Sequence, residues 1–394
     1  MTGLSPMVWW HPSGHRVGFL EPPADPLKAR AWQINDDGTH LRRIVPELEH
    51  GQGPGVWSQD GKRFYYSGAE GEIFVRTAPG ILGFLRKPVV LRLTASGQFR
   101  TPPAADPLNP KRLYVVGSVI RGETMRYDRN SRRWVPFLPG FSGEKIDRSP
   151  DGQWMAYTSV AGSELHKCRL DGSNDILLAR GVDALNPSWS PDGTQSAFSG
   201  RPAGTSVAFK LWLVSSDGGN AAPYGAGVES GYDTIWSGDG QRILLGQGEP
   251  FQSHIRILQL KTGQVQSVPD SERLFSPRWS PDEKQMVAME ANTGKLFLLN
   301  AATSEWRPIG EAPMGYPKWS RDGKYIYGDA GGFGTVQALR VEVATGRREE
   351  IARSDFKPIG ATGSGAWLGW TEDWEPLTVR DLSSTQIYRI DLDR

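Results

Sequence analysis

The six histidines and the single cysteine of this 394-residue chain are where metal or nucleophilic chemistry would be sought first. His11 and His15 flank one predicted turn, but this spacing is a weak metal signal, and we interpret both as surface histidines. Cys168 lies in an alternating apolar–polar stretch, which predicts a packed thiol and not a reactive one. The other histidines are scattered along the chain, at His40, His50, His166 and His254. The sequence therefore predicts no metal and no other cofactor.

Hydrolase chemistry also lacks its usual sequence signals. The chain contains no Gly-x-Ser-x-Gly segment, which is the nucleophile elbow of α/β hydrolases. The glycine-rich segment Gly51-Gln52-Gly53-Pro54-Gly55 precedes a predicted strand, whereas phosphate binding needs the amide groups at the start of a helix. We therefore predict no catalytic residue and no enzyme activity.

The charge of the chain is nearly balanced. Lys and Arg number 45 and Asp and Glu number 44, which gives a formal net charge of +1 with no basic block. Nucleic-acid binding needs a concentrated positive footprint, so this domain is not expected to bind nucleic acid. No apolar run reaches the roughly 18 residues of a membrane-spanning helix, and no signal peptide is evident at the N-terminus.

A five-residue segment recurs along the chain at intervals of roughly 40 to 50 residues, the length of a four-stranded propeller blade. Its clearest copies read Trp-Ser-Pro-Asp-Gly, in which Pro presets φ, Asp bonds to nearby amides and Gly accepts a positive φ. The copies begin at Trp10, Trp57, Leu108, Arg148, Trp189, Trp236, Trp279, Trp319 and Trp370, and those at Leu108 and Trp370 are degenerate. Each copy is expected to form the turn between the first two strands of a blade.

The tryptophan and aspartate positions that recur in this segment are interpreted as structural. We expect the tryptophans to pack between adjacent blades, at Trp10, Trp57, Trp189, Trp236, Trp279, Trp319 and Trp370. The motif aspartates are expected to stabilise turns, because one carboxylate per blade cannot gather the six to eight oxygens that calcium prefers. These are Asp60, Asp151, Asp192, Asp239, Asp282 and Asp322.

The repeats predict an all-β chain that forms a single β-propeller of four-stranded antiparallel blades across residues 1–394. Nine repeats are counted, approximately 1–50, 51–98, 99–141, 142–182, 183–227, 228–270, 271–312, 313–354 and 355–394. The ninth repeat has no residues left for a fourth strand, so we expect residues 3–7 at the N-terminus to close the ring. A ring of eight blades with one terminal repeat outside it is the alternative.

One insertion in the second repeat has a composition typical of a contact surface. Residues 79–88 combine four large apolar side chains with two cations. The simpler interpretation is that this loop folds over its own blade. The alternative is a docking loop, because exposed apolar groups beside charges mark partner surfaces. Its binding residues would be Leu82, Phe84, Leu85, Arg86 and Lys87.

The Trp-Ser-Pro-Asp-Gly pattern resembles the TolB-like, WD-repeat-like propeller repeats of bacterial proteins, and the resemblance covers essentially the whole chain. Three stretches, 91–128, 274–282 and 377–388, are similar to the C-terminal propellers of bacterial, especially acidobacterial, winged-helix regulators and related kinases. The resemblance implies a sensory or docking domain. It leaves the compartment open, cytoplasmic as written or periplasmic if the chain belongs to a membrane-tethered regulator.

We therefore predict a noncatalytic binding, sensing or scaffold propeller, monomeric, whose partner is a protein or peptide, with a glycan as a further candidate. The alternative is a propeller enzyme, a polysaccharide lyase or hydrolase with a funnel active site. An enzyme should show a compact cluster of His, Arg and carboxylates at the ring centre with perturbed protonation. A scaffold should show a varied, unpaired polar surface there.

Overall fold

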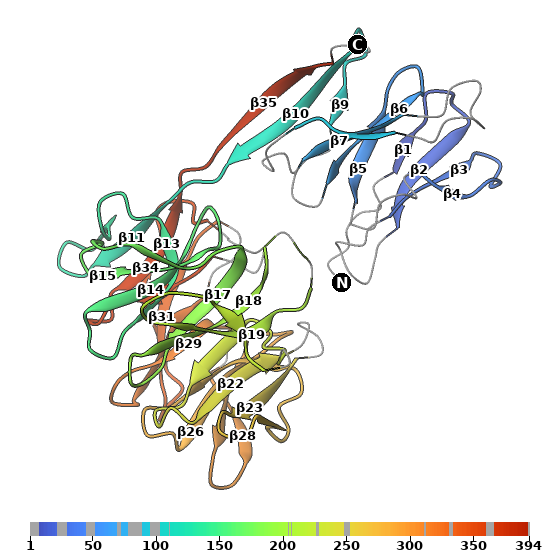
Figure 1. Cartoon of the computed structure of the whole chain (residues 1–394). Helices are drawn as coiled ribbons and strands as arrows, with labels where there is room; N and C mark the ends of the chain where they lie inside the picture. Colours follow the sequence, from blue (N-terminus) through green and yellow to red (C-terminus); the bar gives the residue numbers. More distant parts are fainter. Residues whose placement is uncertain are drawn as a thin grey trace. The chain divides into compact units, whose positions relative to one another are not determined.

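A computed structural model describes residues 8–21, 30–44, 52–68, 72–77, 89–94, 103–109, 111–203, 205, 207–225, 228–247, 253–310, 313–330, 334–359 and 366–392. The described residues form β-strands and turns and contain no helix, hence none that could span a membrane. The chain divides into two compact units (Figure 1). Unit 1 comprises Met1–Ile120, Gly204–Ser206 and Ser383–Arg394, and unit 2 comprises Arg121–Ala203 and Val207–Leu382.

Unit 2 contains six four-stranded antiparallel sheets in its described residues. Five are built from consecutive strands. These are β13 (Gly143–Arg148), β14 (Trp154–Ser159), β15 (Leu165–Arg169) and β16 (Ile176–Ala179); β17 (Val182–Trp189), β18 (Gln195–Pro202), β19 (Lys210–Ser215) and β20 (Ala222–Pro223); β21 (Asp233–Trp236), β22 (Arg242–Gln247), β23 (His254–Gln259) and β24 (Gln264–Ser267); β25 (Leu274–Trp279), β26 (Gln285–Glu290), β27 (Leu296–Asn300) and β28 (Glu305–Ile309); and β29 (Gly315–Trp319), β30 (Tyr325–Asp329), β31 (Gln337–Glu342) and β32 (Arg348–Arg353).

The sixth sheet joins the two ends of unit 2. Its strand order is β12-β11-β34-β33, with β11 (Gly122–Asp128), β12 (Arg133–Pro136), β33 (Gly369–Trp370) and β34 (Pro376–Asp381). β11 pairs antiparallel with β34, from Gly122 opposite Asp381 to Arg126 opposite Leu377. The Arg126–Glu375 and Arg380–Glu123 ion pairs span the same junction. We call this the closing sheet, because it leaves neither end of unit 2 with an open strand edge.

The six sheets form a ring. The first strands of consecutive sheets contact one another in the order β13, β17, β21, β25 and β29, and the closing sheet contacts β13. The circuit is completed between the last sheet and the closing sheet, where Tyr327 packs against Trp370 at 4.9 Å between ring centroids. Because β13, β17, β21, β25, β29 and β33 are edge strands that meet their counterparts, they line the inner edge of the ring.

The hydrophobic core of unit 2 lies between neighbouring sheets. One cluster contains Val287 and Leu298 of one sheet with Ile326, Leu339 and Trp319 of the next. Second strands are apolar on both faces, as at Ile243-Leu244-Leu245, which are fully buried. Burial on two faces explains their continuous apolar sequence, since each sheet has a neighbouring sheet on either side.

The described residues of unit 1 form two four-stranded sheets and a three-stranded one. The four-stranded sheets are β1 (Val8–Trp10), β2 (Arg16–Glu21), β3 (Arg30–Asn35) and β4 (Arg42–Arg43), and β5 (Gln52–Trp57), β6 (Arg63–Gly68), β7 (Ile73–Thr77) and β8 (Val90–Arg92). The third has the order β35-β10-β9, with β9 (Ala104–Ala105), β10 (Arg112–Val119) and β35 (Ser384–Asp391).

The all-β fold with four-stranded antiparallel sheets agrees with the prediction, but the third and ninth repeats are not blades. Repeat 99–141 is divided between β9–β10 in unit 1 and β11–β12 in unit 2, and repeat 355–394 is divided between β33–β34 and β35. The described strands therefore fall into two compact units, in one of which six sheets form a ring, and the count of nine or eight blades is not confirmed. The physical reason is that β34 satisfies its backbone groups on β11. Residues 3–7, expected to close the ring, lie outside the described residues.

Candidate functional site on the inner strands of unit 2

The recurring turn places each motif serine and aspartate in the same local hydrogen-bond network. In the copy at Ser190, the hydroxyl donates to Asp192 at 2.6 Å and accepts the backbone N–H of Gln195 at 3.0 Å. The Asp192 carboxylate also accepts the Thr194 N–H at 3.0 Å, and the Ser190 hydrogen bond is the main cause that lowers its pKa. The same Ser–Asp bond occurs at Asp60, Asp151, Asp239, Asp282 and Asp322.

The motif tryptophans lie at sheet boundaries, with one exception. The indole N–H groups of Trp189, Trp236 and Trp319 donate to backbone carbonyls of the preceding sheet, at 3.1 to 3.2 Å. Trp57 and Trp370 are also buried, whereas Trp10 is 61% exposed. The indole N–H of Trp279 is buried without a hydrogen-bond partner. The buried tryptophans therefore contribute packing surface, and three of them also contribute a hydrogen bond, between neighbouring sheets.

A different set of residues converges at the inner edge of the ring. The position three residues before each motif start is polar in five successive sheets of unit 2: Lys145, Asn186, Asp233, Ser276 and Tyr316. Four of these, Lys145, Asn186, Ser276 and Tyr316, have φ between 46° and 54° and lie where the strand register shifts at a β-bulge. Such backbone conformations are rare for residues other than glycine, and bulges re-aim side chains near functional sites.

Lys145 and Tyr316 meet across the inner edge. The ammonium group of Lys145 on β13 donates to the phenol oxygen of Tyr316 on β29 at 3.1 Å and lies 4.8 Å from the centre of its ring. Burial alone would lower the pKa of Lys145, but Tyr316, Glu144 and Asp233 together raise it. β13 and β29 belong to the two sheets on either side of the closing sheet, so this pair bridges sheets that are not adjacent.

Asp233 lies on β21 and contacts residues of the two neighbouring sheets. Its carboxylate accepts the Arg278 guanidinium at 2.9 Å and the Asn186 amide at 3.3 Å. Asn186 also donates to the carbonyl of Tyr232 at 2.8 Å. Asp233 is 4% exposed, and a buried carboxylate is tolerated because it is paired and hydrogen-bonded.

The position directly before the motif start carries charge in three of these sheets: Asp147, Arg278 and Lys318. Asp147 accepts the backbone N–H of Trp189 at 2.8 Å, and burial raises its pKa despite the nearby Lys318 and Arg278. Lys318 is exposed to solvent. Partial desolvation of its ammonium group by the surrounding protein lowers its pKa first, Asp147 opposes this effect, and the nearby Arg278, Arg148 and Arg321 add to it.

We call seven of these residues the inner-edge cluster. It consists of Lys145, Asp147, Asn186, Asp233, Arg278, Tyr316 and Lys318. No catalytic or binding role was assigned to any of them from the sequence. The signal that could have found them is the polar residue type at a fixed distance before the motif, repeated in successive repeats.

Two carboxyl groups near Lys145 carry raised pKa values. Burial raises the pKa of Asp329 to about 7, and its Oδ1 atom has no hydrogen-bond partner. Burial also raises the pKa of Glu144, which is 3% exposed and whose Oε2 atom is likewise without a partner. Both carboxyls lie near the positive charge of Lys145, which partly opposes the effect of burial.

The other residues singled out from the sequence lie elsewhere. Leu82, Phe84, Leu85, Arg86 and Lys87 fall outside the described residues, as does His50. His11 is buried against Trp57 and Gly61 in unit 1, whereas His15 forms an exposed pair with Asp36 at 3.1 Å. Burial raises the pKa of the Cys168 thiol to about 12. No group of three or more His, Cys, Asp or Glu suited to a metal occurs in the described part of the chain.

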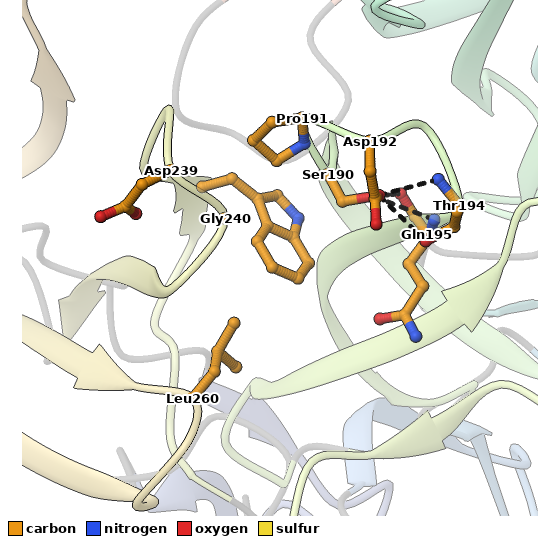
Figure 2. A pocket seen from close by; sticks show the side chains of 9 residues that line it. Ser190, Pro191, Asp192, Thr194, Gln195, Asp239, Gly240 and Leu260 are labelled. Carbon is orange, nitrogen blue, oxygen red and sulfur yellow. Dashed lines mark hydrogen bonds between the residues drawn. The ribbon is translucent and has the colours of Figure 1, made fainter.

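Two pockets lie between sheets at the motif turns. One of about 330 Å³ is lined by Asp192, Gln195, Trp236, Asp239 and Leu260 (Figure 2). Figure 2 shows that the Asp192 carboxylate at its rim is engaged with its own turn. A second pocket of about 270 Å³ occupies the equivalent place between the two preceding sheets. Both pockets are lined by motif turns, whose Ser and Asp side chains already bond within the turn. They are therefore weaker candidates for a binding site than the inner-edge cluster.

Comparison with known proteins supports the fold. No protein-family model and no curated protein sequence matches the chain. The structure of a putative TolB from Agrobacterium tumefaciens is similar at 18% identity and a TM-score of 0.55, covering 67% of this chain and 99% of that chain. The fold is that of a TolB-like β-propeller. TolB from Acinetobacter baumannii (16% identity, TM-score 0.36, 76% of this chain and 65% of that chain) and a nidogen/laminin complex (11%, 0.46, 60% and 93%) match less well.

The inner edge of the propeller combines cations, carboxylates, an amide and a phenol from five sheets. None of the histidines in the described residues lies on an inner strand, since His166 and His254 are on β15 and β23. These groups can form hydrogen bonds and ion pairs with a ligand at a surface to which several sheets contribute.

Proposed function

We propose that unit 2 is a noncatalytic binding propeller, and that the inner-edge cluster recognises a protein or peptide. A binding site at the ring axis needs donors and acceptors that several sheets hold in fixed positions. The β-bulges at Lys145, Asn186, Ser276 and Tyr316 provide that rigidity, because each side chain is carried by a hydrogen-bonded strand.

The observation that carries the proposal is the state of Lys318. This residue is exposed at the inner edge, and its ammonium group forms no hydrogen bond or ion pair with any described residue. Its neighbour Arg278, by contrast, is paired with Asp233. A solvent-accessible, unpaired cation among paired charges is the feature expected where a ligand completes the set.

A role as a sensory or docking domain is consistent with this site. The sequence resembles propellers attached to winged-helix regulators and kinases, and such a domain would transmit the presence of a bound partner. The similarity to a TolB-type structure supports the fold and leaves the partner open.

A second candidate, a glycan-cleaving propeller enzyme, is favoured by one observation. Burial raises the pKa of both Glu144 and Asp329, that of Asp329 to about 7, and a carboxyl with a raised pKa can act as a general acid. Against it, Glu144 is 3% exposed, so a substrate could not reach its carboxyl in this conformation. Hydrolysis of a soluble polysaccharide panel by the wild-type chain, abolished in both Glu144→Gln and Asp329→Asn, would establish the enzyme.

Selection of phage-displayed random peptides on the immobilised full chain tests the binding function. Lys318→Trp introduces a bulky ring at the inner edge, so selected peptides should lose at least about tenfold in affinity for this variant. Lys324→Trp is the matched control, because Lys324 is 74% exposed on the β29–β30 turn of the same sheet. Equal affinity of the selected peptides for wild type and Lys318→Trp would reject the inner edge as the binding site.

A further inference from the structure

We infer that the inner-edge cluster recognises the carboxylate of an acidic peptide segment, and that Lys318 is the residue that binds it. This inference rests on the proposed binding function and specifies the chemistry of the partner. It is carried by the distribution of charge around Lys318.

Lys318 belongs to a group of four cations from three sheets, in which each of three arginines lies within electrostatic range of Lys318. Lys318 interacts with Arg278 of the β25–β28 sheet, Arg148 of the β13–β16 sheet and Arg321 of its own sheet. Three of the four already have carboxylate partners. Arg278 pairs with Asp233 at 2.9 Å, and Glu372 of the closing sheet accepts both Arg148 at 2.9 Å and Arg321 at 2.5 Å.

Lys318 is left without such a partner among the described residues. Asp147, a carboxylate whose charge acts on it, forms no ion pair with it within 4.0 Å and accepts the backbone N–H of Trp189. An incoming anion would therefore gain the interaction that the chain itself does not supply.

Glu372 indicates which anion fits. Its carboxylate lies between guanidinium groups of two sheets, which shows that the surroundings of Lys318 accommodate a carboxylate held by cations from separate sheets. Each of its two carboxylate oxygens contacts a different guanidinium group, Oε2 that of Arg148 and Oε1 that of Arg321. A single unpaired cation matches one carboxylate, whereas a nucleic acid would need a run of unpaired cations, and the chain has a formal net charge of only +1.

Calorimetric titration of the full chain with short amidated peptides of alternating Gly-Glu, and with matched Gly-Gln peptides, tests the inference. We expect the Glu peptide to bind about tenfold tighter, the scale of one charge-assisted hydrogen bond. A Gly-Gln peptide with a free C-terminus distinguishes a terminal carboxylate from a side-chain carboxylate, because it gains affinity only if the terminus is the recognised group.

Lys318→Met keeps the length of the side chain and removes its charge, so the preference for carboxylate should vanish. Lys318→Arg should retain it, and Lys324→Met should leave it unchanged. Equal binding of Glu and Gln peptides, a preference that survives Lys318→Met, or no binding by any of these peptides overturns the inference. Only insensitivity of selected peptides to Lys318→Trp overturns the binding function, so the two failures are distinct.

A second measurement tests the inference without a variant, in case Lys318→Met does not fold. Acetic anhydride labels the lysines of the wild-type chain, and the Glu peptide should slow the acetylation of Lys318 and not that of Lys324. Unchanged labelling of Lys318 overturns the inference. Finally, an oligodeoxythymidine that binds as tightly as the Glu peptide and loses affinity in Lys318→Met would assign the site to nucleic acid instead of an acidic peptide.

Discussion

The ammonium group of Lys145 lies 3.1 Å from the phenol oxygen of Tyr316, and this contact joins two sheets that flank the closing sheet. Both residues occupy the same position of their repeats, three residues before the motif start, and both have positive φ. The bulged inner strands therefore bring equivalent residues from repeats far apart in sequence into direct contact. The pair links the two sides of the junction where the ring closes.

Tyr316→Phe should destabilise unit 2 by about 1–2 kcal/mol, because the buried Lys145 ammonium loses its hydrogen-bond acceptor. The midpoint of urea denaturation followed by circular dichroism measures the loss. Tyr325→Phe is the matched control on the same sheet, since the Tyr325 hydroxyl makes no hydrogen bond to a described residue. Equal midpoints for the two variants would show that the Lys145–Tyr316 bond does not contribute to stability.

Asp329 should make the stability of unit 2 depend on pH. Burial raises its pKa from 3.8 to about 7, so between these values the folded state binds more protons than the unfolded state. Its contribution to stability is therefore fully present below about pH 4 and is lost as pH rises through 7. The loss between pH 4 and pH 8 should be on the order of 2–4 kcal/mol.

Asp329→Asn should remove this dependence and stabilise the chain at pH 8 relative to wild type. Urea denaturation at pH 5 and pH 8 measures both effects. Asp322→Asn is the comparison on the same sheet, because its hydrogen bond from Ser320 lowers the pKa of Asp322 and reverses the sign. A wild-type stability that does not fall between pH 5 and pH 8 would contradict a neutral Asp329 carboxyl.

The repeat spacing predicts most sheets correctly because their turns are local. The Ser190–Asp192 turn, for example, is specified by residues adjacent in sequence, and seven of the nine repeats each span one four-stranded sheet. The division at repeats three and nine could not be derived in this way. β11 pairs with β34 over more than 200 residues of sequence, and nothing in a local motif encodes that pairing. The degenerate motif copies at Leu108 and Trp370, and the missing fourth strand of the ninth repeat, are local signs that these two repeats differ.

The candidate site was less accessible to sequence reasoning than the fold. The recurring motif points to its own Trp and Asp residues. In the structure these lie at sheet boundaries and in turns, as Trp189 and Asp192 do. Lys145, Asp233 and Lys318 precede the motif, and their importance depends on which strand forms the inner edge of a closed ring. Which strand forms the inner edge is decided by ring closure. A local sequence pattern can therefore indicate that these positions are polar, but not that their side chains meet at the inner edge.

The motif tryptophans should differ in how much they stabilise the ring. Trp189 donates its indole N–H to the carbonyl of Asp147 in the preceding sheet at 3.2 Å, whereas the buried indole N–H of Trp279 has no partner. Trp189→Phe should therefore cost about 1 kcal/mol more than Trp279→Phe, by the value of one hydrogen bond. Urea denaturation of both variants measures the difference. Equal losses would indicate that ring packing alone determines the contribution of the motif tryptophan.

The motif serine should be as important as the aspartate. Ser190 is 4% exposed, donates to Asp192 and accepts the Gln195 N–H, so Ser190→Ala leaves a buried amide and one carboxylate oxygen without this partner. We expect a loss of about 1–2 kcal/mol, measured as a lower melting temperature. Ser267→Ala, at an exposed strand end, is the control and should leave the melting temperature unchanged. If Ser190→Ala and Ser267→Ala have the same melting temperature, the recurrence of serine in this motif has a cause other than the stability of the turn.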